Sequence, residues 1–203
     1  MSERNPTRSA LLEMQDEQRA MHEGHVFLDE KCLLLAGEML RQLGEHAVLQ
    51  QRLRQAHETA VLALRAAIGR HGLEGVQCQA AAPQDAARGR TETGMLMGVR
   101  LLQAEWIPDT APAPEGVAPS PEVREARRAF VDLMAAAAPL AAVSGNLERL
   151  SEEYRRSVRR ARALQDVLLP ELGRDIADIQ TRIEELEQQD AIAMRRGALG
   201  AAR

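Results

Sequence analysis

The stretch His22-Glu23-Gly24-His25 comes closer to a metal motif than any other part of this sequence. It is one residue short of H-E-x-x-H, because Val26 stands where the second histidine would be. A zinc site that uses His25, Cys32 and a third ligand is one interpretation, since imidazole and thiolate are both zinc ligands. The favoured interpretation is that His25 is a polar residue in a helix seam that sets register. We therefore expect no metal and no cofactor.

Nucleophilic and phosphate-binding chemistry also lack their usual patterns. Cys32 and Cys78 have no neighbours typical of a catalytic cysteine. Lys31 is the only lysine, so no Gly-Lys-Ser/Thr phosphate loop can be present. Carboxylates are plentiful, but none is paired in an identifiable cleft. The sequence predicts a chain with no catalytic residues, in which any nucleotide would be bound by another subunit.

A basic stripe runs through the C-terminal half, formed by Arg155, Arg156, Arg159, Arg160 and Arg162. On a helix it points away from the neighbouring apolar positions. It is interpreted either as a solvated face or as a contact with an acidic partner. A net charge of -4 and the lack of an aromatic platform argue against nucleic acid as that partner.

Composition indicates which elements must position these residues. Aromatic residues are only 2% of a 203-residue chain, whereas hydrophobic residues are 45%, so a rounded enzyme core is disfavoured and long helices are favoured. The polar start is not a signal peptide. The longest apolar stretch, 133–143, contains Pro139 and is short of the ~20 residues that a membrane span needs. We expect a cytoplasmic protein without membrane insertion.

The first long helix is expected to begin with Asn5 as its N-cap and Pro6 as its first residue, and to end near Gly69 and Gly72. Its seam positions recur every three or four residues: Leu11, Met14, Gln18, Met21, His25, Leu28, Cys32, Leu35, Met39, Gln42, His46, Leu49, Leu53, Ala56, Ala60, Ala63 and Ala67. A spacing of this kind, held over so many turns, is typical of a coiled coil.

The second long helix is expected to begin after the N-cap Ser120 and to end near Arg196, with Pro139 and Ser144-Gly145-Asn146 as points where it can kink. Its seam comprises Leu147, Leu150, Tyr154, Ser157, Ala161, Leu164, Leu168, Leu172, Ile176, Ile179, Ile183, Leu186 and Ala193. The steps of four from Leu164 to Ile176 form a stutter that contains Pro170. Between the helices, residues 94–107 are expected to form one or two short strands, at most a hairpin, followed by a Pro-rich loop.

The predicted fold class is all-α dominated: a long antiparallel two-helix coiled coil with a small mid-chain lobe. The predicted divisions are 1–71 for the first helix, 72–120 for the lobe and loop, and 121–203 for the second helix. Matching the wide apolar patch Cys32-Leu33-Leu34-Leu35 with the one at Leu168, Leu169 and Leu172 sets a register in which paired residue numbers sum to roughly 204. A helix of ~60 residues is ~90 Å long, so a rod is expected.

Several segments resemble the axle protein of the V-type and A-type rotary ATPases, their D subunit. Asn5-Pro6-Thr7-Arg8 is similar to the family's opening N-P-T-[KR], and Met97-Gly98-Val99 to a short M-G-V segment. The stretch 146–172 is similar to a run that ends R-R-V-N-A-L-E-x-V-L-I-P-x-L. The chain departs from the family where its basic K-x-K-R-D becomes Asp29-x-Lys31-Cys32-Leu33, and where its C-terminal aromatic pair is replaced around Met194.

The resemblance implies a non-catalytic central axle that couples ATP hydrolysis or synthesis to ion transport, as a cytoplasmic subunit peripheral to the membrane. The implied partners are the A and B subunits of the catalytic ring, the F subunit, and the socket subunit above the membrane rotor ring. The expected partner contacts are Asn5, Pro6, Thr7, Arg8, Met97, Gly98, Val99, Trp106, Arg155, Arg156, Arg159, Arg160, Met194 and Arg195.

Two other functions are compatible with parts of the sequence. The first is the coiled-coil stalk of a bacterial export ATPase, which shares the helical hairpin but lacks the mid-chain lobe. The second is a metal-dependent helical enzyme, which depends only on His22, His25 and Cys32. The M-G-V lobe and the Leu-Leu-Pro-x-Leu segment favour the rotor subunit over both.

Overall fold

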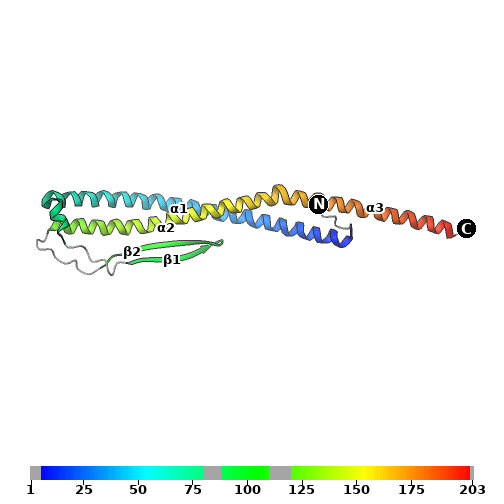
Figure 1. Cartoon of the computed structure of the whole chain (residues 1–203), viewed down its shortest axis with the longest axis horizontal. Coiled ribbons are helices and arrows are strands. Elements are labelled where there is room, and N and C mark those ends of the chain that lie inside the picture. The colour runs from blue at the N-terminus through cyan, green and yellow to red at the C-terminus, as the bar shows by residue number, and fades with distance from the viewer. Residues whose placement is uncertain (1–5, 80–87, 110–119, 202–203) are drawn as a thin grey trace. The chain divides into compact units, whose positions relative to one another are not determined.

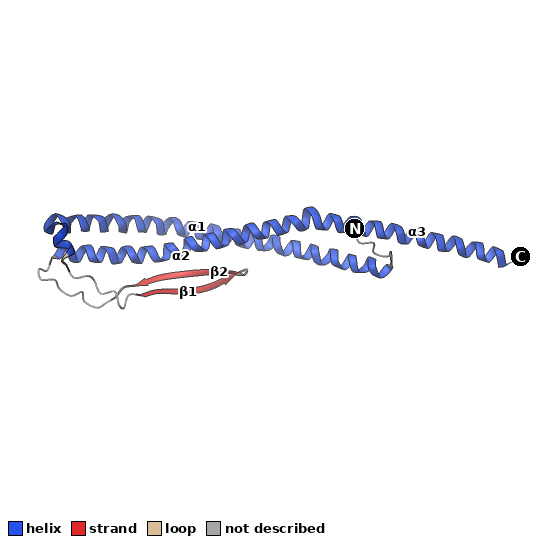
Figure 2. Cartoon of the chain, viewed as in Figure 1, coloured by secondary structure: helices blue, strands red, loops and turns tan. Residues whose placement is uncertain are grey.

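The computed structural model describes residues 6–79, 88–109 and 120–201, with side chains described as far as residue 195. Its elements are α1 (Arg8–Gln77), β1 (Arg88–Leu96), β2 (Val99–Ile107), α2 (Pro121–Ala163), a π-helical segment η1 (Leu164–Leu168) and α3 (Leu169–Ala201). Helices dominate the chain, and the two strands lie together in its middle (Figure 2). The predicted fold class is therefore confirmed.

The chain divides into two compact units. The terminal unit comprises Met1–Leu33 and Arg155–Arg203, and the central unit comprises Leu34–Tyr154. Each unit contains a stretch of α1 paired with a stretch of the C-terminal helices. The predicted divisions at 71/72 and 120/121 follow the elements rather than these units, and remain predictions.

In the terminal unit, α1 packs antiparallel against α3 through a small apolar cluster. Met14, Leu172 and Ile179 are buried there, with partly buried side chains around them: Leu11, Met21, Ile176 and Ile183. Gly24 faces Leu164 and Gly173 faces Gln18, so residue numbers rise on one helix as they fall on the other. These contacts confirm the predicted antiparallel pairing in this unit.

In the central unit, α1 and α2 pair along the same seam and the β hairpin lies beside them (Figure 1). Leu35, Leu150 and Val99 form one buried cluster, so the hairpin contributes to the core. A second buried cluster is made of Ala67, Val123 and Ala126, with Ala63 and Val76 packed against it. Small side chains let the two backbones approach closely there.

The predicted seam is confirmed along α1, where every seam position from Leu11 to Ala67 is buried or half-buried. On the second side it holds from Leu147 to Ile183 except at Leu168, which lies in η1 and is exposed. Leu186 and Ala193 are exposed, so their assignment to the seam is wrong. Arg8, the first residue of α1, pairs with Glu187, so Leu186 lies at the end of the helix pairing and Ala193 lies beyond it.

The predicted register is wrong by about two heptads. It would place Glu58 opposite Asn146, but Gln42 lies there, with 3.5 Å between the Asn146 Nδ2 and the Gln42 Oε1. The patches used to set it do not meet: Leu35 packs with Leu150, Leu172 packs with Met14, and Leu33 and Leu34 are 75% and 50% exposed. Apolar residues repeat along both seams, so apolar matching alone leaves several registers open.

The helix ends are partly as predicted. Thr7, not Asn5, caps α1: the Ala10 N–H donates to the Thr7 Oγ1 at 3.2 Å, and Asn5 lies outside the described residues. Gly72 interrupts α1 with φ 71°, as its left-handed preference predicts. Ser120 caps α2 as predicted, and the last helix continues past Gly197 to Ala201.

The stutter corresponds to a change in helix type. Leu164–Leu168 is π-helical, and the Leu169 N–H donates to the Leu164 carbonyl, five residues back. Pro170 has no N–H to donate, and in a regular α-helix its ring would clash with the carbonyl four residues earlier. The wider turn relieves this conflict. By contrast, α2 is continuous through Pro139.

Candidate partner-binding surfaces

The residues of the metal interpretation do not form a site. Among residues 6–79, 88–109 and 120–201, no group of three His, Cys, Asp or Glu side chains could hold a metal ion. His25 is half-buried, its Nδ1 lies 3.5 Å from the Asp29 carboxylate, and its buried Nε2 has no hydrogen-bond partner. Burial raises the pKa of the Cys32 thiol, which disfavours the thiolate that ligation and nucleophilic attack require. His25 thus belongs to the helix seam.

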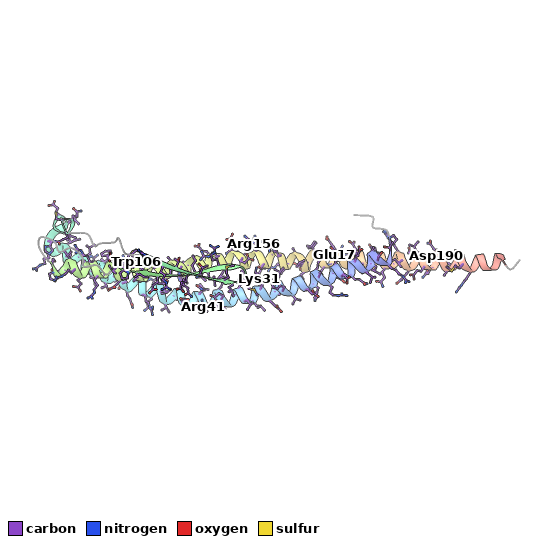
Figure 3. All side chains as sticks on the ribbon, turned by 90° about the horizontal axis from the view of Figure 1, so that it is seen from below. Glu17, Lys31, Arg41, Trp106, Arg156 and Asp190 are labelled. Atoms are coloured by element: carbon purple, nitrogen blue, oxygen red, sulfur yellow. The ribbon has the colours of Figure 1, made fainter. Side chains whose placement is uncertain are left out.

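The basic stripe of α2 faces solvent within the terminal unit. Arg155, Arg156, Arg159 and Arg160 are all exposed, whereas Ser157 between them is 1% exposed. Figure 3 labels Arg156 on this stretch of α2. The structure therefore confirms that the stripe points away from the seam, and its contact with an acidic partner remains a prediction.

The N-terminal residues that resemble the family's opening are organised by α1. Thr7 is the N-cap, Pro6 precedes it, and Arg8 is the first helical residue. The Arg8 guanidinium donates to the Glu187 Oε1 through Nη2 at 2.6 Å and through Nε at 3.2 Å. Both side chains are largely exposed, so this ion pair adds little stability, but it marks where α1 and α3 stop pairing.

The end of α3 has no paired helix among the described residues of its unit. Figure 1 shows its red end continuing past the first turn of α1, and Asp190 lies on this part in Figure 3. Two of its apolar side chains are strongly exposed, Ile192 at 52% and Met194 at 75%, and Arg195 is exposed beside them. This end presents an apolar surface that none of the described residues of the terminal unit covers.

The mid-chain lobe is an antiparallel hairpin that is longer than predicted. Its register runs from Arg88↔Ile107 to Leu96↔Val99, so Met97 and Gly98 form a two-residue turn. Both turn residues have positive φ, 47° and 85°, which is the type I′ geometry that matches strand twist. The exposed first half of β1, Arg-Gly-Arg-Thr-Glu-Thr, lacks the apolar alternation that predicts a strand.

The predicted contact residues in the hairpin lie in different environments. Val99 is 6% exposed and packs with Leu35 and Leu150, and Met97 is half-buried against the same cluster. Trp106 is half-buried near the far end of β2 (Figure 3). Met97 and Val99 thus hold the turn against the helices, and a partner contact through either remains a prediction.

Asn146 links the hairpin to both helices, a role that the sequence pattern does not predict. Its Oδ1 accepts from the Leu102 N–H at 2.8 Å, and its Nδ2 donates to the Leu102 carbonyl at 2.8 Å. Arg149 donates to the Asn146 Oδ1 at 2.7 Å and to the Arg100 carbonyl at 2.9 Å. Asn146 is 2% exposed, so its polar atoms need these partners. The available signal was an amide residue flanking the seam of α2 and another, Gln42, in the seam of α1.

A second polar group joins the end of α1 to the start of α2. The His71 Nε2 lies 2.7 Å from the Ser120 Oγ, and that hydroxyl donates to the Glu122 Oε2 at 2.9 Å. The Arg70 Nε lies 3.4 Å from the Glu122 Oε1. A backbone hydrogen bond and the Ser120 hydroxyl lower the pKa of Glu122. Because Ser120 donates to a carboxylate and not to His71, this is a helix cap rather than an activated serine.

One stretch of helix passes a length-and-composition test for a membrane span. It lies within Pro121–Arg195, and 17% of its most apolar stretch is buried. The core helix of a soluble protein passes the same test, and this stretch contains Pro139 and the half-buried side chains of 136–140. This apolar and largely exposed part of α2 is therefore another surface that a partner could contact.

Known proteins resemble this chain over nearly its whole length. The family model of the ATP synthase D subunit matches residues 10–196. The chain is 25% identical over 193 residues to the V-type ATP synthase D subunit of Thermotoga neapolitana, with 94% of this chain and 95% of the relative covered. It is 29% identical to the V-type ATP synthase D subunit of Anaeromyxobacter dehalogenans, with 97% and 96% covered. It is 27% identical to the A-type ATP synthase D subunit of Methanopyrus kandleri, with 95% and 84% covered.

The match includes both helices and the hairpin, and so fits neither the export-ATPase stalk nor a metal-dependent enzyme. The matched range also spans the residues of the buried seam, of the hairpin turn and of the π-helical segment. This chain is a member of the ATP synthase D-subunit family.

Proposed function

We propose that this chain is the central rotor subunit of a V/A-type rotary ATPase, a non-catalytic axle that couples ATP hydrolysis or synthesis to ion movement. The observation that carries the proposal is the family match across 10–196, which spans the paired helices and the hairpin between them. An axle needs stiffness and surfaces for its partners, and it needs no reaction centre of its own.

The paired helices supply the stiffness. Within each unit the helices are held by a narrow strip of Leu, Ile, Met and Ala, which needs no aromatic side chains. This explains why so few aromatic residues are present. Many charged side chains are exposed, including Arg155, Arg156, Arg159 and Arg160. Such a surface suits a rotor protein that contacts changing faces of its neighbours as it turns.

The partners that we propose are the A and B subunits of the catalytic ring, the F subunit and the socket subunit above the membrane rotor ring. The uncovered end of α3, with Ile192 and Met194 exposed, is the proposed contact within the ring. The hairpin is the proposed contact with the other rotor subunits. In this arrangement the chain is cytoplasmic and peripheral to the membrane.

Truncation tests the axle role. Removing Met1–Glu17 together with Glu185–Arg203 deletes the proposed ring contacts but leaves the central unit intact. In the reconstituted complex we expect weaker coupling between ATP hydrolysis and ion transport, with basal hydrolysis retained. Complete loss of hydrolysis would contradict a non-catalytic axle.

A matched pair of point variants tests the end of α3 without a truncation. Met194→Asp places a charge on the exposed apolar end, whereas Glu185→Asp changes an exposed acidic position and keeps its charge. The proposal expects reduced coupling in the first variant and unchanged coupling in the second. Equal coupling in both would remove this end from the set of contacts.

The hairpin contact is tested by assembly. Met95 is 69% exposed on β1, so Met95→Asp alters the surface of the hairpin but not its packing. We expect less F subunit to be recovered with the Met95→Asp chain in a pull-down, while the Thr91→Asp variant behaves as wild type. Unchanged recovery after deletion of Gly94–Ile107 would refute docking by the hairpin.

A further inference from the structure

We propose that Asn146 is a lock that fixes two things with one side chain: the register of α1 against α2, and the attachment of the hairpin to the helices. Because the same amide group serves both, loss of this one side chain would undock the hairpin and loosen the helix register together. This inference concerns internal mechanics and does not depend on the rotor role.

The first argument is that the hydrogen-bonding capacity of the Asn146 amide is used fully. A side-chain amide has two N–H donors and an oxygen with two lone pairs. The oxygen accepts from the Leu102 N–H and from Arg149, and the nitrogen donates to the Leu102 carbonyl and to Gln42. At 2% exposure, water cannot replace a lost partner without rearrangement.

The second argument is that the seam positions one heptad away from Gln42 on either side are apolar. One heptad before Gln42 in the seam is Leu35, and one heptad after it is Leu49, both buried leucines. A slip of one heptad in either direction keeps apolar residues in the seam but places leucine opposite Asn146. Buried polar residues set register in coiled coils for this reason. Glu38 holds Gln42 in turn, since the Gln42 Nε2 donates to the Glu38 Oε1 at 2.9 Å.

The third argument concerns the way the hairpin is attached. Leu96 and Val99 form the closing pair of the turn, and from there hydrogen-bonded and non-hydrogen-bonded residue pairs alternate along the hairpin. The pair of Thr93 and Leu102 is one of the non-hydrogen-bonded pairs, so the backbone of Leu102 does not bond to β1. Its N–H and C=O point away from β1, and Asn146 satisfies both, as a third strand would. Arg149 does the same for the Arg100 carbonyl. The outer edge of β2 is therefore joined to α2, while β1 lies on the far, exposed side.

Amide exchange tests the attachment in the full-length chain. In Asn146→Leu we expect the Leu102 amide to exchange at least ten times faster than in wild type. The Gln103 amide bonds across the hairpin to β1, so it is the internal control and should change much less. Unchanged protection at Leu102 would overturn the proposal.

Spin-label distances test the register. Gln51 and Met134 are exposed on α1 and α2 of the central unit, and they can be labelled as cysteines once Cys32 and Cys78 are replaced by serine. Wild type should give one distance. Asn146→Leu should add a second population, because a slip of one heptad moves a helix by ~10 Å along its axis. A single unchanged distance would overturn the register part.

Two further variants separate the register from the hairpin attachment and show whether an effect of Asn146→Leu comes only from misfolding. Gln42→Leu should broaden the distance distribution but leave most of the protection at Leu102. Asn146→Asp keeps the acceptor for Leu102 and Arg149, so the Leu102 amide should stay protected even if Asn146→Leu unfolds. Loss of Leu102 protection in Asn146→Asp, with helical content intact, would contradict the assigned geometry.

Discussion

Leu35 of α1 and Leu150 of α2 pack in the same cluster and are both 0% exposed. They form the centre of the central unit, with Val99 of the hairpin as the third buried member. Leu33 and Leu34, immediately before Leu35, lie on the exposed side of the same helix. Consecutive leucines of one helix therefore differ sharply in burial at this point.

Leu35→Ala should therefore destabilise the protein by about 2–5 kcal/mol, because it leaves a cavity in a closed cluster. Leu33→Ala, at an exposed position, is the matched control and should change the free energy of unfolding by less than about 0.5 kcal/mol. Urea unfolding followed by far-ultraviolet circular dichroism measures both. Similar losses in the two variants would mean that the cluster is not the core.

The hairpin turn offers a backbone test. Gly98 has φ 85°, and a Cβ added there meets open space, so Gly98→Ala is disfavoured only by its backbone conformation. We expect the hairpin to lose about 1–2 kcal/mol. Gly94→Ala, which also meets open space but has no positive φ, should be neutral or slightly stabilising. Amide exchange of residues 99–107 compares the two, and equal effects would rule out the type I′ turn.

The cap of α2 gives a third prediction. Ser120→Ala removes the acceptor for the Val123 N–H and the contact with His71, so it should destabilise the protein by about 1 kcal/mol. Faster exchange of the Val123 amide should accompany this loss. Thr59→Ala, whose hydroxyl bonds only to the Gln55 carbonyl of its own helix, is the control. A Thr59→Ala variant as unstable as Ser120→Ala would argue against a special role for the cap.

The fourth prediction is a dependence on pH. The hydrogen bond from Arg41 lowers the pKa of Glu38 below its ordinary value of 4.5. A carboxylate with a lowered pKa stabilises the fold above its unfolded value and loses that contribution as the pH falls through the folded value. Wild type should therefore lose stability below pH ~4.5 more steeply than Glu38→Gln does.

Arg41→Gln provides the control for this pH effect. It removes the cause of the shift, so it should flatten the same part of the stability profile, and the double variant should add little more. Unfolding measured from pH ~6 to ~3 gives the profiles. An equally steep loss in Glu38→Gln would show that other carboxylates account for it.

The sequence is a better guide to which residues are buried than to which residues contact one another. The three-four spacing identified the seam from Leu11 to Ile183, because burial on one helix face depends on local periodicity alone. Register depends on a partner far away in the chain, and apolar heptads fit in several offsets. The pairing of Gln42 with Asn146 decides among them, and two polar residues do not stand out in an apolar pattern.

The candidate surfaces show the same division. The exposure of the arginine stripe followed from its place on a helix, and Ser120 was recognisable as a cap from sequence. The inward orientation of Val99 and the link from Asn146 to Leu102 depend on how the hairpin folds back onto α2. A hydrogen bond between a strand backbone and a helix side chain leaves no periodic pattern in the sequence.

The π-helical segment also controls angular phase along the last helix. An α-helix turns by ~100° per residue, so deleting one residue from Leu164–Leu168 would rotate everything after it by that angle. Leu172 and Ile179 would then leave Met14 and turn towards solvent. The π-helical turn takes up one extra residue, so that Leu172 and Ile179 still face α1. The number of residues before Pro170 therefore matters as much as their identity.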